Sequence, residues 1–202
     1  EENGKIILPK EASNFWTKKQ LWDLIVENAH QTGEPGLTFI DRINQDNATP
    51  HLGRIEAANP CGEQPLLPYE SCNLASINLD KMMHSVNGTC EIDYDKLSRT
   101  VKTAVRFLDD VIEVNKFPLP QIEEMTKANR KIGLGIMGFA DALHGLGVGY
   151  NTEDGLKWGE RFMRFINEEG HRASENLGLE RGNFPNWKGS AWDVEHHRSM
   201  RN

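Results

Sequence analysis

The chain has 202 residues, of which 38% are hydrophobic and 26% charged, a composition typical of a soluble globular protein with one sizeable core. The formal net charge of -7 argues against a protein that coats nucleic acid, because binding a phosphate backbone requires a basic face. No apolar run approaches the roughly 18 residues of a membrane span. Three cysteines without a C-x-x-C pair indicate a reducing, cytoplasmic location. Their spacing to the histidines predicts no metal site.

The first predicted elements are a helix and a short strand. Thr17 and Gln20 form a capping-box pair, which places the start of a helix directly after Thr17. Gly33 and Pro35 end this helix, and the apolar run at residues 37–40 predicts a short buried strand.

The loop-rich segment that follows contains the most reactive group of side chains. Asn59, Cys61 and Glu63 alternate along it, and an extended backbone would turn all three to one face. Pro60 and Gly62 lie between them and favour a rigid loop tip over a regular strand. An amide, a thiol and a carboxylate at one spot can perform nucleophilic or acid–base chemistry. A polar turn around a buried structural cysteine explains the pattern equally well.

The second half of the chain is predicted to be mostly helical. Residues 72–79 alternate polar with small or apolar side chains and predict a half-buried strand. A long helix is expected over about 94–115, with Asp93 as N-cap and one buried stripe, Leu97, Val101, Val105, Leu108 and Ile112. The prolines at residues 117–120 end it, and a shorter helix continues through Arg130.

A last helix is predicted over about residues 153–177. Its inward positions are Leu156, Phe162, Met163, Ile166, Ala173 and Leu177. Its solvent-exposed face includes Arg161, Arg164, Glu168 and Glu169.

Residues 133–138 match the G-x-G-x-x-G pattern of dinucleotide-binding loops, and Glu153 and Asp154 lie where a ribose-binding acid would follow. However, a helix-like segment precedes these glycines, and more glycines follow where the next strand should lie. We therefore interpret the glycines as allowing close packing of the backbone against a neighbouring helix.

A family resemblance joins these features. The loop Asn59-Pro60-Cys61-Gly62-Glu63 and its continuation, Leu67-Pro68-Tyr69-Glu70-Ser71-Cys72-Asn73-Leu74-Ala75-Ser76-Ile77-Asn78-Leu79, resemble the active-site region of the ribonucleotide reductase large chain. Residues 130–141 resemble a further block of this family, in the same order. The resemblance spans roughly residues 17–202 and is closest to the class II, adenosylcobalamin-dependent branch.

The resemblance implies a fold. Residues 1–202 would be a central fragment of the catalytic domain, a ten-stranded α/β barrel that is helix-rich in this part. Residues 56–70 would form its finger loop, and no second domain is expected.

The resemblance also implies roles for individual residues. Cys61 would carry a transient thiyl radical that abstracts the 3′ hydrogen of the ribose, and burial of the loop tip inside the barrel would shield it. Glu63 would take the proton of the 3′-hydroxyl, and Asn59 would hold the ribose. Cys72 would be one half of a redox pair that ends as a disulfide. Its partner lies upstream of Cys61 in the family, where this chain has no cysteine. Cys90, in a turn-like stretch, matches no family position.

The implied function is reduction of ribonucleotide di- or triphosphates to 2′-deoxyribonucleotides for DNA synthesis. Adenosylcobalamin would be the cofactor, and thioredoxin or glutaredoxin the reductant. Deoxynucleotides or ATP would act as effectors on a homodimer. We expect the chain alone to be inactive because it lacks parts of the family's site. The alternatives are a class I large chain, a non-catalytic split-gene piece that must be joined to its missing parts, and a cofactor-free nucleotide-binding module.

Overall fold

The computed structural model describes residues 5–6, 16–86 and 88–202, which belong to two compact units, Glu1–Phe39 and Ile40–Asn202. In the first unit, the short strands β1 (Lys5–Ile6) and β2 (Trp16–Thr17) pair antiparallel and precede α1 (Lys18–Thr32). The remaining residues of the predicted fragment, 1–4, 7–15 and 87, lie outside the described part.

The predicted capping box at the start of α1 is confirmed. The backbone N–H of Thr17 donates to Oε1 of Gln20 at 2.9 Å, and the N–H of Gln20 donates to Oγ1 of Thr17 at 3.2 Å. The helix ends at Gly33, as predicted. The strand predicted at residues 37–40 is wrong, because residues 34–39 have no regular structure and Ile40 begins a helix. An apolar run forms a strand only where a second strand accepts its hydrogen bonds, and none of the described strands pairs with it.

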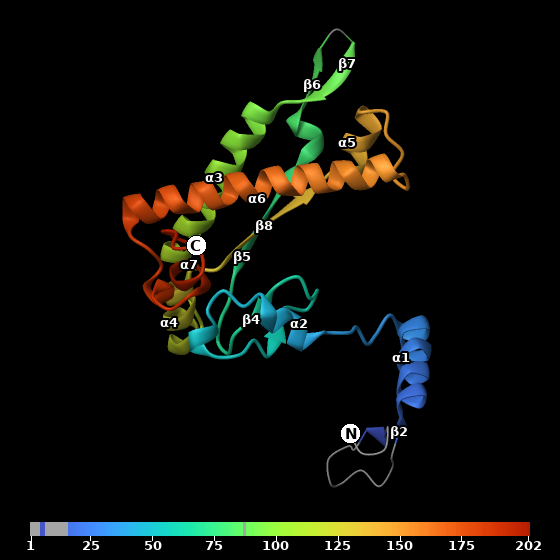
Figure 1. Ribbon diagram of the computed structural model, residues 1–202, viewed down its shortest axis with the longest axis vertical. Helices are drawn as coiled ribbons and strands as arrows, with labels where there is room; N and C mark the ends of the chain where they lie inside the picture. The colour runs from blue at the N-terminus through green and yellow to red at the C-terminus, as the bar shows by residue number, and fades with distance from the viewer. Residues whose placement is uncertain (1–4, 7–15, 87) are drawn as a thin grey trace. The chain divides into compact units, whose positions relative to one another are not determined.

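The second unit is mixed α/β (Figure 1). Its elements in chain order are α2 (Ile40–Gln45), β3 (Ala57–Ala58), β4 (Pro65–Leu66), β5 (Asn73–Asn78), β6 (Met83–Val86), β7 (Thr89–Ile92), α3 (Tyr94–Val114), α4 (Pro120–Asn129), β8 (Ile132–Met137), α5 (Phe139–Gly145), α6 (Glu153–Arg181) and α7 (Ala191–Val194). Short 3₁₀ turns lie at Pro50–Leu52, Leu79–Met82 and Pro185–Trp187.

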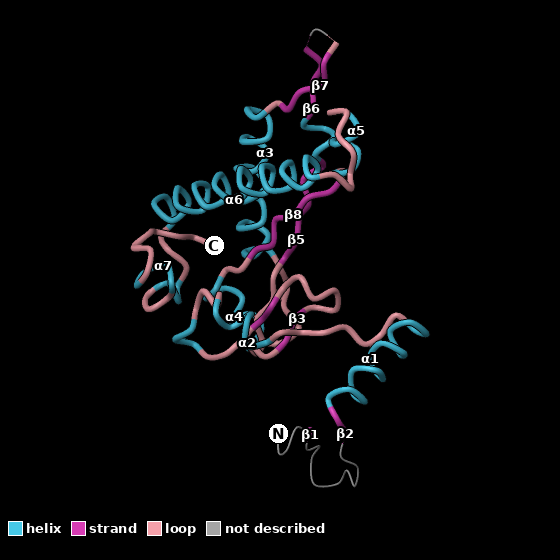
Figure 2. The backbone as a smooth tube through the Cα atoms, turned by 45° about the vertical axis from the view of Figure 1, so that its right-hand side comes forward, coloured by secondary structure: helices cyan, strands magenta, loops and turns pink. Residues whose placement is uncertain are grey.

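A pair of parallel strands forms the central sheet of this unit. β5 pairs with β8 from Asn73, opposite Ile132, to Asn78, opposite Met137. The connection between them runs through the β6–β7 hairpin, α3 and α4, which gives the parallel pair the long crossover that it requires. Helices α3 and α6 cross each other beside the strands (Figures 1 and 2), and their apolar side chains form one core with those of β5 and β8.

The two long helices show where periodicity succeeds and where it fails. The predicted stripe of α3 is buried throughout, and Asp93 caps the helix by accepting the N–H of Lys96 at 2.8 Å. In α6, which continues to Arg181, Leu156 is 68% exposed and Met163 is 40% exposed. Both were predicted to face inward. At 100° per residue, Leu156 lies about 240° around the helix from the buried Phe162, and therefore on another face.

Glu169 of α6 was predicted to be solvent-exposed, and this is also wrong. Its side chain is buried between α6 and α3, where it accepts a hydrogen bond from Oγ of Ser98 at 2.5 Å. Two cations form ion pairs with this carboxylate: Nζ of Lys102 lies 3.5 Å from Oε2, and Nη1 of Arg172 lies 2.5 Å from Oε1. The hydrogen bond from Ser98, the largest influence, holds the pKa of this carboxyl below its usual range, so Glu169 stays charged while it joins the two helices.

The fully buried carboxylate of Asp109 connects distant parts of the unit. Nε of Arg130 donates to its Oδ1 at 2.8 Å, and Nη1 of Arg181 donates to its Oδ2 at 2.8 Å. Asn202 donates through Nδ2 at 2.8 Å, and Nε of Arg201 lies 3.4 Å from Oδ2. Burial opposes the charge, but these hydrogen bonds and the Arg130 charge outweigh it and hold the pKa of Asp109 below its usual range.

We predict that Asp109→Asn lowers the free energy of unfolding by about 3 kcal/mol at pH 7, because it removes the buried counter-charge of Arg130, which then keeps only the outer carboxylate of Glu113. The contribution of this charge is complete above the ordinary carboxyl pKa of about 3.9 and is lost as the pH falls through the lower value of the folded state. The penalty should therefore shrink in strong acid. Urea unfolding of both proteins from pH 7 downward measures it.

Asp154→Asn is the matched control. Asp154 pairs with Lys157 at 2.9 Å, with both side chains largely exposed, so its loss should change stability by less than about 0.5 kcal/mol. Equal losses in the two variants would contradict the role of Asp109.

Candidate active site

The predicted reactive loop forms the tip of a β hairpin. β3 and β4 pair antiparallel, and residues 59–64 connect them. The N–H of Asn59 donates to the carbonyl oxygen of Gln64 at 3.1 Å, and the N–H of Gly62 donates to that of Asn59 at 3.0 Å. The predicted loop tip is thus a hydrogen-bonded turn and not a regular strand.

The amide and the carboxylate of the loop meet, although for a different reason than predicted. Nδ2 of Asn59 donates to Oε1 of Glu63 at 2.5 Å, while Oδ1 of Asn59 accepts the N–H of Gln64 at 3.0 Å. The backbone between them is turned and not extended. Pro60, with its fixed φ, occupies the second position of the turn, and Gly62 has a φ of 82°. The turn, and not strand-like alternation, brings Asn59 and Glu63 together.

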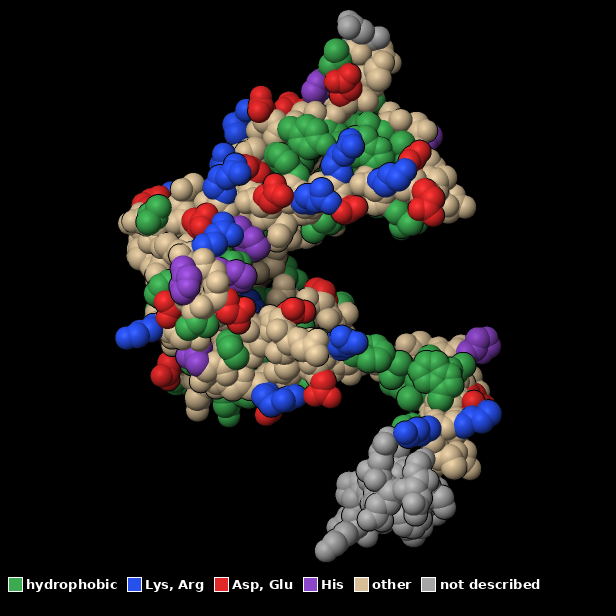
Figure 3. Space-filling view, in the orientation of Figure 1, with side chains coloured by type: hydrophobic (Ala, Val, Ile, Leu, Met, Phe, Trp, Pro, Cys, Tyr) green, Lys and Arg blue, Asp and Glu red, His purple; other side chains and the backbone are tan. Residues whose placement is uncertain are grey.

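Cys61 lies at the third position of this turn and is exposed. Figure 3 shows a hollow between the part of the chain with α6 and the part that carries the hairpin. The described sheets contain two strands each, so the described residues do not enclose Cys61 in a closed barrel. The shielding expected for a radical thiol is therefore not provided within this part of the chain.

Cys72 lies at the amino end of the central strand pair. The strand predicted over residues 72–79 is present as β5 but begins at Asn73, so Cys72 directly precedes it and is half-buried. Burial raises the pKa of its thiol, the positive charge of Lys131 offsets part of the rise, and the carboxylates of Glu70 and Glu63 add to it. The Glu63 carboxylate on the hairpin tip is thus one of the charges that act on the Cys72 thiol.

The glycine pattern at residues 133–138 is part of a strand and not a phosphate loop. Gly133 and Gly135 lie within β8, and only Gly138 lies in the turn before α5. A dinucleotide-binding loop instead places its glycines between a strand and a helix. The rejection of that function is thus supported, and at Gly133 the closest packing is against a hairpin and a strand and not against a helix. The space that a Cβ of Gly133 would occupy is filled by the ends of Gln64 and Leu74, so this glycine admits the hairpin.

Cys90 was predicted to lie in a turn, and this is wrong. It lies in β7, opposite Ser85 of β6. Its Sγ would be 3.4 Å from a Cβ built on Gly145 of α5. α5 follows the carboxyl end of β8, whereas Cys72 precedes the amino end of β5. The length of the strand pair, about 17 Å, therefore separates Cys90 from Cys72.

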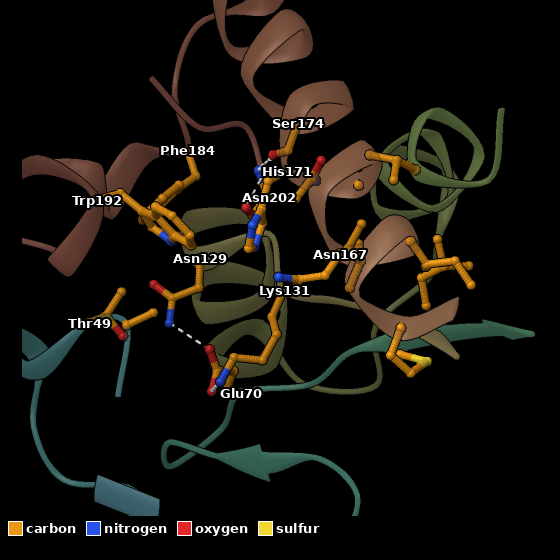
Figure 4. A pocket seen from close by; sticks show the side chains of 17 residues that line it. Thr49, Glu70, Asn129, Lys131, Asn167, His171, Ser174, Phe184, Trp192 and Asn202 are labelled. Atoms are coloured by element: carbon orange, nitrogen blue, oxygen red, sulfur yellow. Dashed lines mark hydrogen bonds and ion pairs between the residues drawn. The ribbon is translucent and has the colours of Figure 1, made fainter. Parts of the chain in front are cut away.

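A cavity of about 310 Å³ opens beside the amino end of β8. Figure 4 shows Glu70, Asn129 and Lys131 at one side of it, and His171, Trp192 and Phe184 at others. Burial, the largest influence, lowers the pKa of His171, so its imidazole is neutral near pH 7. The sequence analysis assigned no role to Glu70 or Lys131, although both lie inside the two blocks that carry the family resemblance.

Within the described ranges, no group of three or more His, Cys, Asp or Glu side chains could hold a metal ion. No helix in the same ranges is long and apolar enough to cross a membrane.

We predict that Gly133→Ala destabilises the unit by about 1–2 kcal/mol and loosens the hairpin, because the new methyl group would overlap the ends of Gln64 and Leu74. Gly135→Ala, two residues along the same strand, is the control, since the nearest atom to its Cβ is Oγ of Ser76 at 3.8 Å. Urea unfolding and hydrogen exchange at the hairpin amides measure both. Equal effects would argue against close packing of the hairpin on β8.

Comparison with known proteins gives a consistent result. Residues 9–200 match the family described as "Ribonucleotide reductase, barrel domain". A vitamin B12-dependent ribonucleoside-diphosphate reductase of Thermoplasma acidophilum is 55% identical over 88% of this chain and 23% of its own length. One from Mycobacterium tuberculosis strain H37Rv is 49% identical over 90% of this chain and 24% of its own. The chain spans about a quarter of the length of these relatives.

Two more distant proteins are also similar. The ribonucleoside-diphosphate reductase subunit alpha of Chlamydia trachomatis serovar D is 37% identical over 87% of this chain and 17% of its own length. The class Id ribonucleotide reductase alpha subunit of Actinobacillus ureae shares the fold, with a TM-score of 0.72 at 24% identity, over 92% of this chain and 35% of that one. Because the family match extends over residues 9–200, the chain belongs to the ribonucleotide reductase barrel-domain family.

Proposed function

We propose that this chain is part of an enzyme that reduces ribonucleotides to 2′-deoxyribonucleotides, with Cys61 as the thiol that carries the radical. The observation that carries the proposal is the hairpin tip, where the Asn59–Glu63 hydrogen bond closes around a turn that presents Cys61. The names of the relatives as ribonucleoside-diphosphate reductases support the same reaction.

In the proposed mechanism, the Cys61 thiyl radical takes the 3′ hydrogen, so that a C–H bond breaks and an S–H bond forms. Glu63 accepts the proton of the 3′-hydroxyl and later returns it, and a proton from one redox thiol lets the 2′-hydroxyl leave as water, while the second thiol supplies the proton that C2′ gains. Asn59 donates to the Glu63 carboxylate at 2.5 Å and so fixes its orientation before substrate binds. Two electrons come from Cys72 and a second thiol, which end as a disulfide. Cys61 then returns the hydrogen atom to C3′.

Adenosylcobalamin is the proposed cofactor, because the relatives from Thermoplasma acidophilum and Mycobacterium tuberculosis are named vitamin B12-dependent. The Cys61 thiol fits this assignment in being exposed, and so open to a group from outside the described residues. When bound, the cofactor would supply the unpaired electron that makes Cys61 a thiyl radical. Cys61 is the residue that would face the cofactor.

The second redox thiol must come from outside the three cysteines of this chain. Cys90 lies about 17 Å of strand length away from Cys72, well beyond the roughly 7 Å between Cα atoms that a disulfide allows. We therefore propose that the 202 residues alone are inactive. In the complete enzyme, thioredoxin or glutaredoxin would reduce the disulfide in the cytoplasm, and nucleotide effectors would act on a homodimer.

A class I enzyme, whose radical comes from a separate subunit, is the second candidate. The chlamydial relative, 37% identical, is named a subunit alpha, and this naming of a subunit is compatible with the second candidate. The complete reductase that contains this segment should require added cobalamin for turnover. Turnover with only a second protein subunit and dioxygen would instead support class I.

We predict that Cys61→Ser abolishes ribonucleotide reduction in the complete enzyme even with a strong chemical reductant, because a serine hydroxyl cannot replace the thiyl radical. Cys72→Ser should still permit attack on the substrate but stop reduction to the deoxynucleotide. Product analysis with a labelled ribonucleotide distinguishes these outcomes.

Cys90→Ser is the matched control and should retain full activity, since Cys90 lies at the other end of the strand pair. Identical behaviour of the Cys61 and Cys72 variants, with substrate left intact in both, would refute the assigned roles.

A further inference from the structure

Glu70 is a buried carboxylate that the proposed mechanism does not use. It lies two residues before Cys72, and its side chain is inaccessible to solvent. Its Oε2 accepts the N–H of Leu67 at 2.9 Å and Nζ of Lys131 at 2.7 Å, and its Oε1 accepts Nδ2 of Asn129 at 2.8 Å. A carboxylate with three donors in a buried position is firmly fixed, so it provides a rigid attachment point for the ammonium group of Lys131.

Lys131 also contacts the reactive hairpin. Its Nζ donates to the carbonyl oxygen of Pro65 at 3.1 Å, and Pro65 begins β4, the second strand of the hairpin. The Lys131 ammonium thus bridges Glu70 and the hairpin. Its side chain is 26% exposed, so this bridge lies near the protein surface.

The sheet register places Lys131 beside Cys72. Asn73 and Ile132 are the first paired residues of the parallel strands, and Cys72 and Lys131 directly precede them. Neighbouring strands lie about 4.8 Å apart, so the backbones of these two residues are neighbours. The backbone of Lys131 thus lies next to that of the redox cysteine, Cys72, and the side chain of Lys131 contacts the Cys61 hairpin.

We propose that Lys131 is a positioning residue that fixes the Cys61 hairpin beside Cys72 and keeps a positive charge next to the Cys72 thiol. The roles of the two cysteines rest on the proposed function. The positive charge favours the thiolate, the form that takes part in thiol–disulfide exchange.

The charges around Cys72 agree with this role. Burial raises the pKa of its thiol, Lys131 before β8 opposes the rise, and Glu70 before β5 and Glu63 on the hairpin add to it. Among the charged groups that act on the pKa of Cys72, Lys131 is the cation and lowers the pKa, whereas the two carboxylates raise it. Its removal and the removal of Glu70 should therefore move the ionisation of Cys72 in opposite directions.

The test measures alkylation of Cys72 by iodoacetamide as a function of pH. The 202-residue chain is used with Cys61→Ser and Cys90→Ser, so that Cys72 is the one reactive thiol. We expect Lys131→Met to shift the rate profile to higher pH and to slow alkylation at pH 8 about fivefold. Glu70→Gln should shift the profile to lower pH, and Lys131→Arg, which keeps the charge, should stay close to the parent.

This design separates the proposal from a loss of folding. Unfolding would remove the burial that raises the pKa of Cys72 and would therefore speed alkylation, opposite to the effect expected for Lys131→Met. Lys127→Met is the matched control, because Lys127 pairs with Glu123 on the surface of α4 at 2.6 Å and should leave the profile unchanged. An unshifted profile in Lys131→Met would overturn the electrostatic part of the proposal.

Hydrogen exchange tests the positioning part. The amides of Asn59 and Gln64 are bonded within the hairpin, and they should exchange faster in Lys131→Met than in Lys127→Met. Equal exchange in the two variants would refute the support of the hairpin by Lys131. Neither measurement requires nucleotide reduction, so failure of the proposed enzymatic function and failure of this proposal give separate results.

Discussion

The parallel pairing of β5 with β8 determines which residues of the candidate site become neighbours of Cys72. The residues that directly precede the pair, Cys72 and Lys131, become neighbours because Asn73 lies opposite Ile132. A shift of this register by one residue would exchange the two faces of a strand. It would turn Ile132 out of the core and would move Gly133 away from the hairpin. The register therefore links the packing of the core to the geometry of the site.

Two kinds of support hold the hairpin against these strands. One is the absence of a side chain, since Gly133 leaves space for Gln64. The other is a charged contact, since Lys131 joins the carbonyl of Pro65 to the buried Glu70. The packing at Gly133 tolerates almost no added side-chain volume. The contacts of Lys131 depend instead on its positive charge and on the length of its side chain. The two supports are consequently sensitive to different substitutions, and each can be tested without the other.

The sequence analysis succeeded where the information is local. The N-cap at Asp93 and the stripe that follows it lie within one helix, and the turn chemistry of Pro60 and Gly62 lies within one loop. It failed for the run at residues 37–40, because a strand depends on a partner elsewhere. Glu169 was misassigned for the same reason, since the Ser98 that stabilises it lies 71 positions away.

The candidate site shows the same division. Asn59, Cys61 and Glu63 could be proposed from their spacing, and the family resemblance added Cys72. The pairing of Glu70 with Lys131 could not be predicted, because 61 positions separate them and each is a common surface residue type.

Asp109 has a consequence for how this unit assembles. Its partners Arg130, Arg181 and Asn202 are 21, 72 and 93 positions away in the sequence. Until all of them arrive, removing the carboxylate from water costs more than its partial contacts return. Intermediate arrangements with some of the segments in place are thus disfavoured. The strand pair, the two long helices and the segment after α7 should form together, in a single cooperative step that is limited by the closure of long loops.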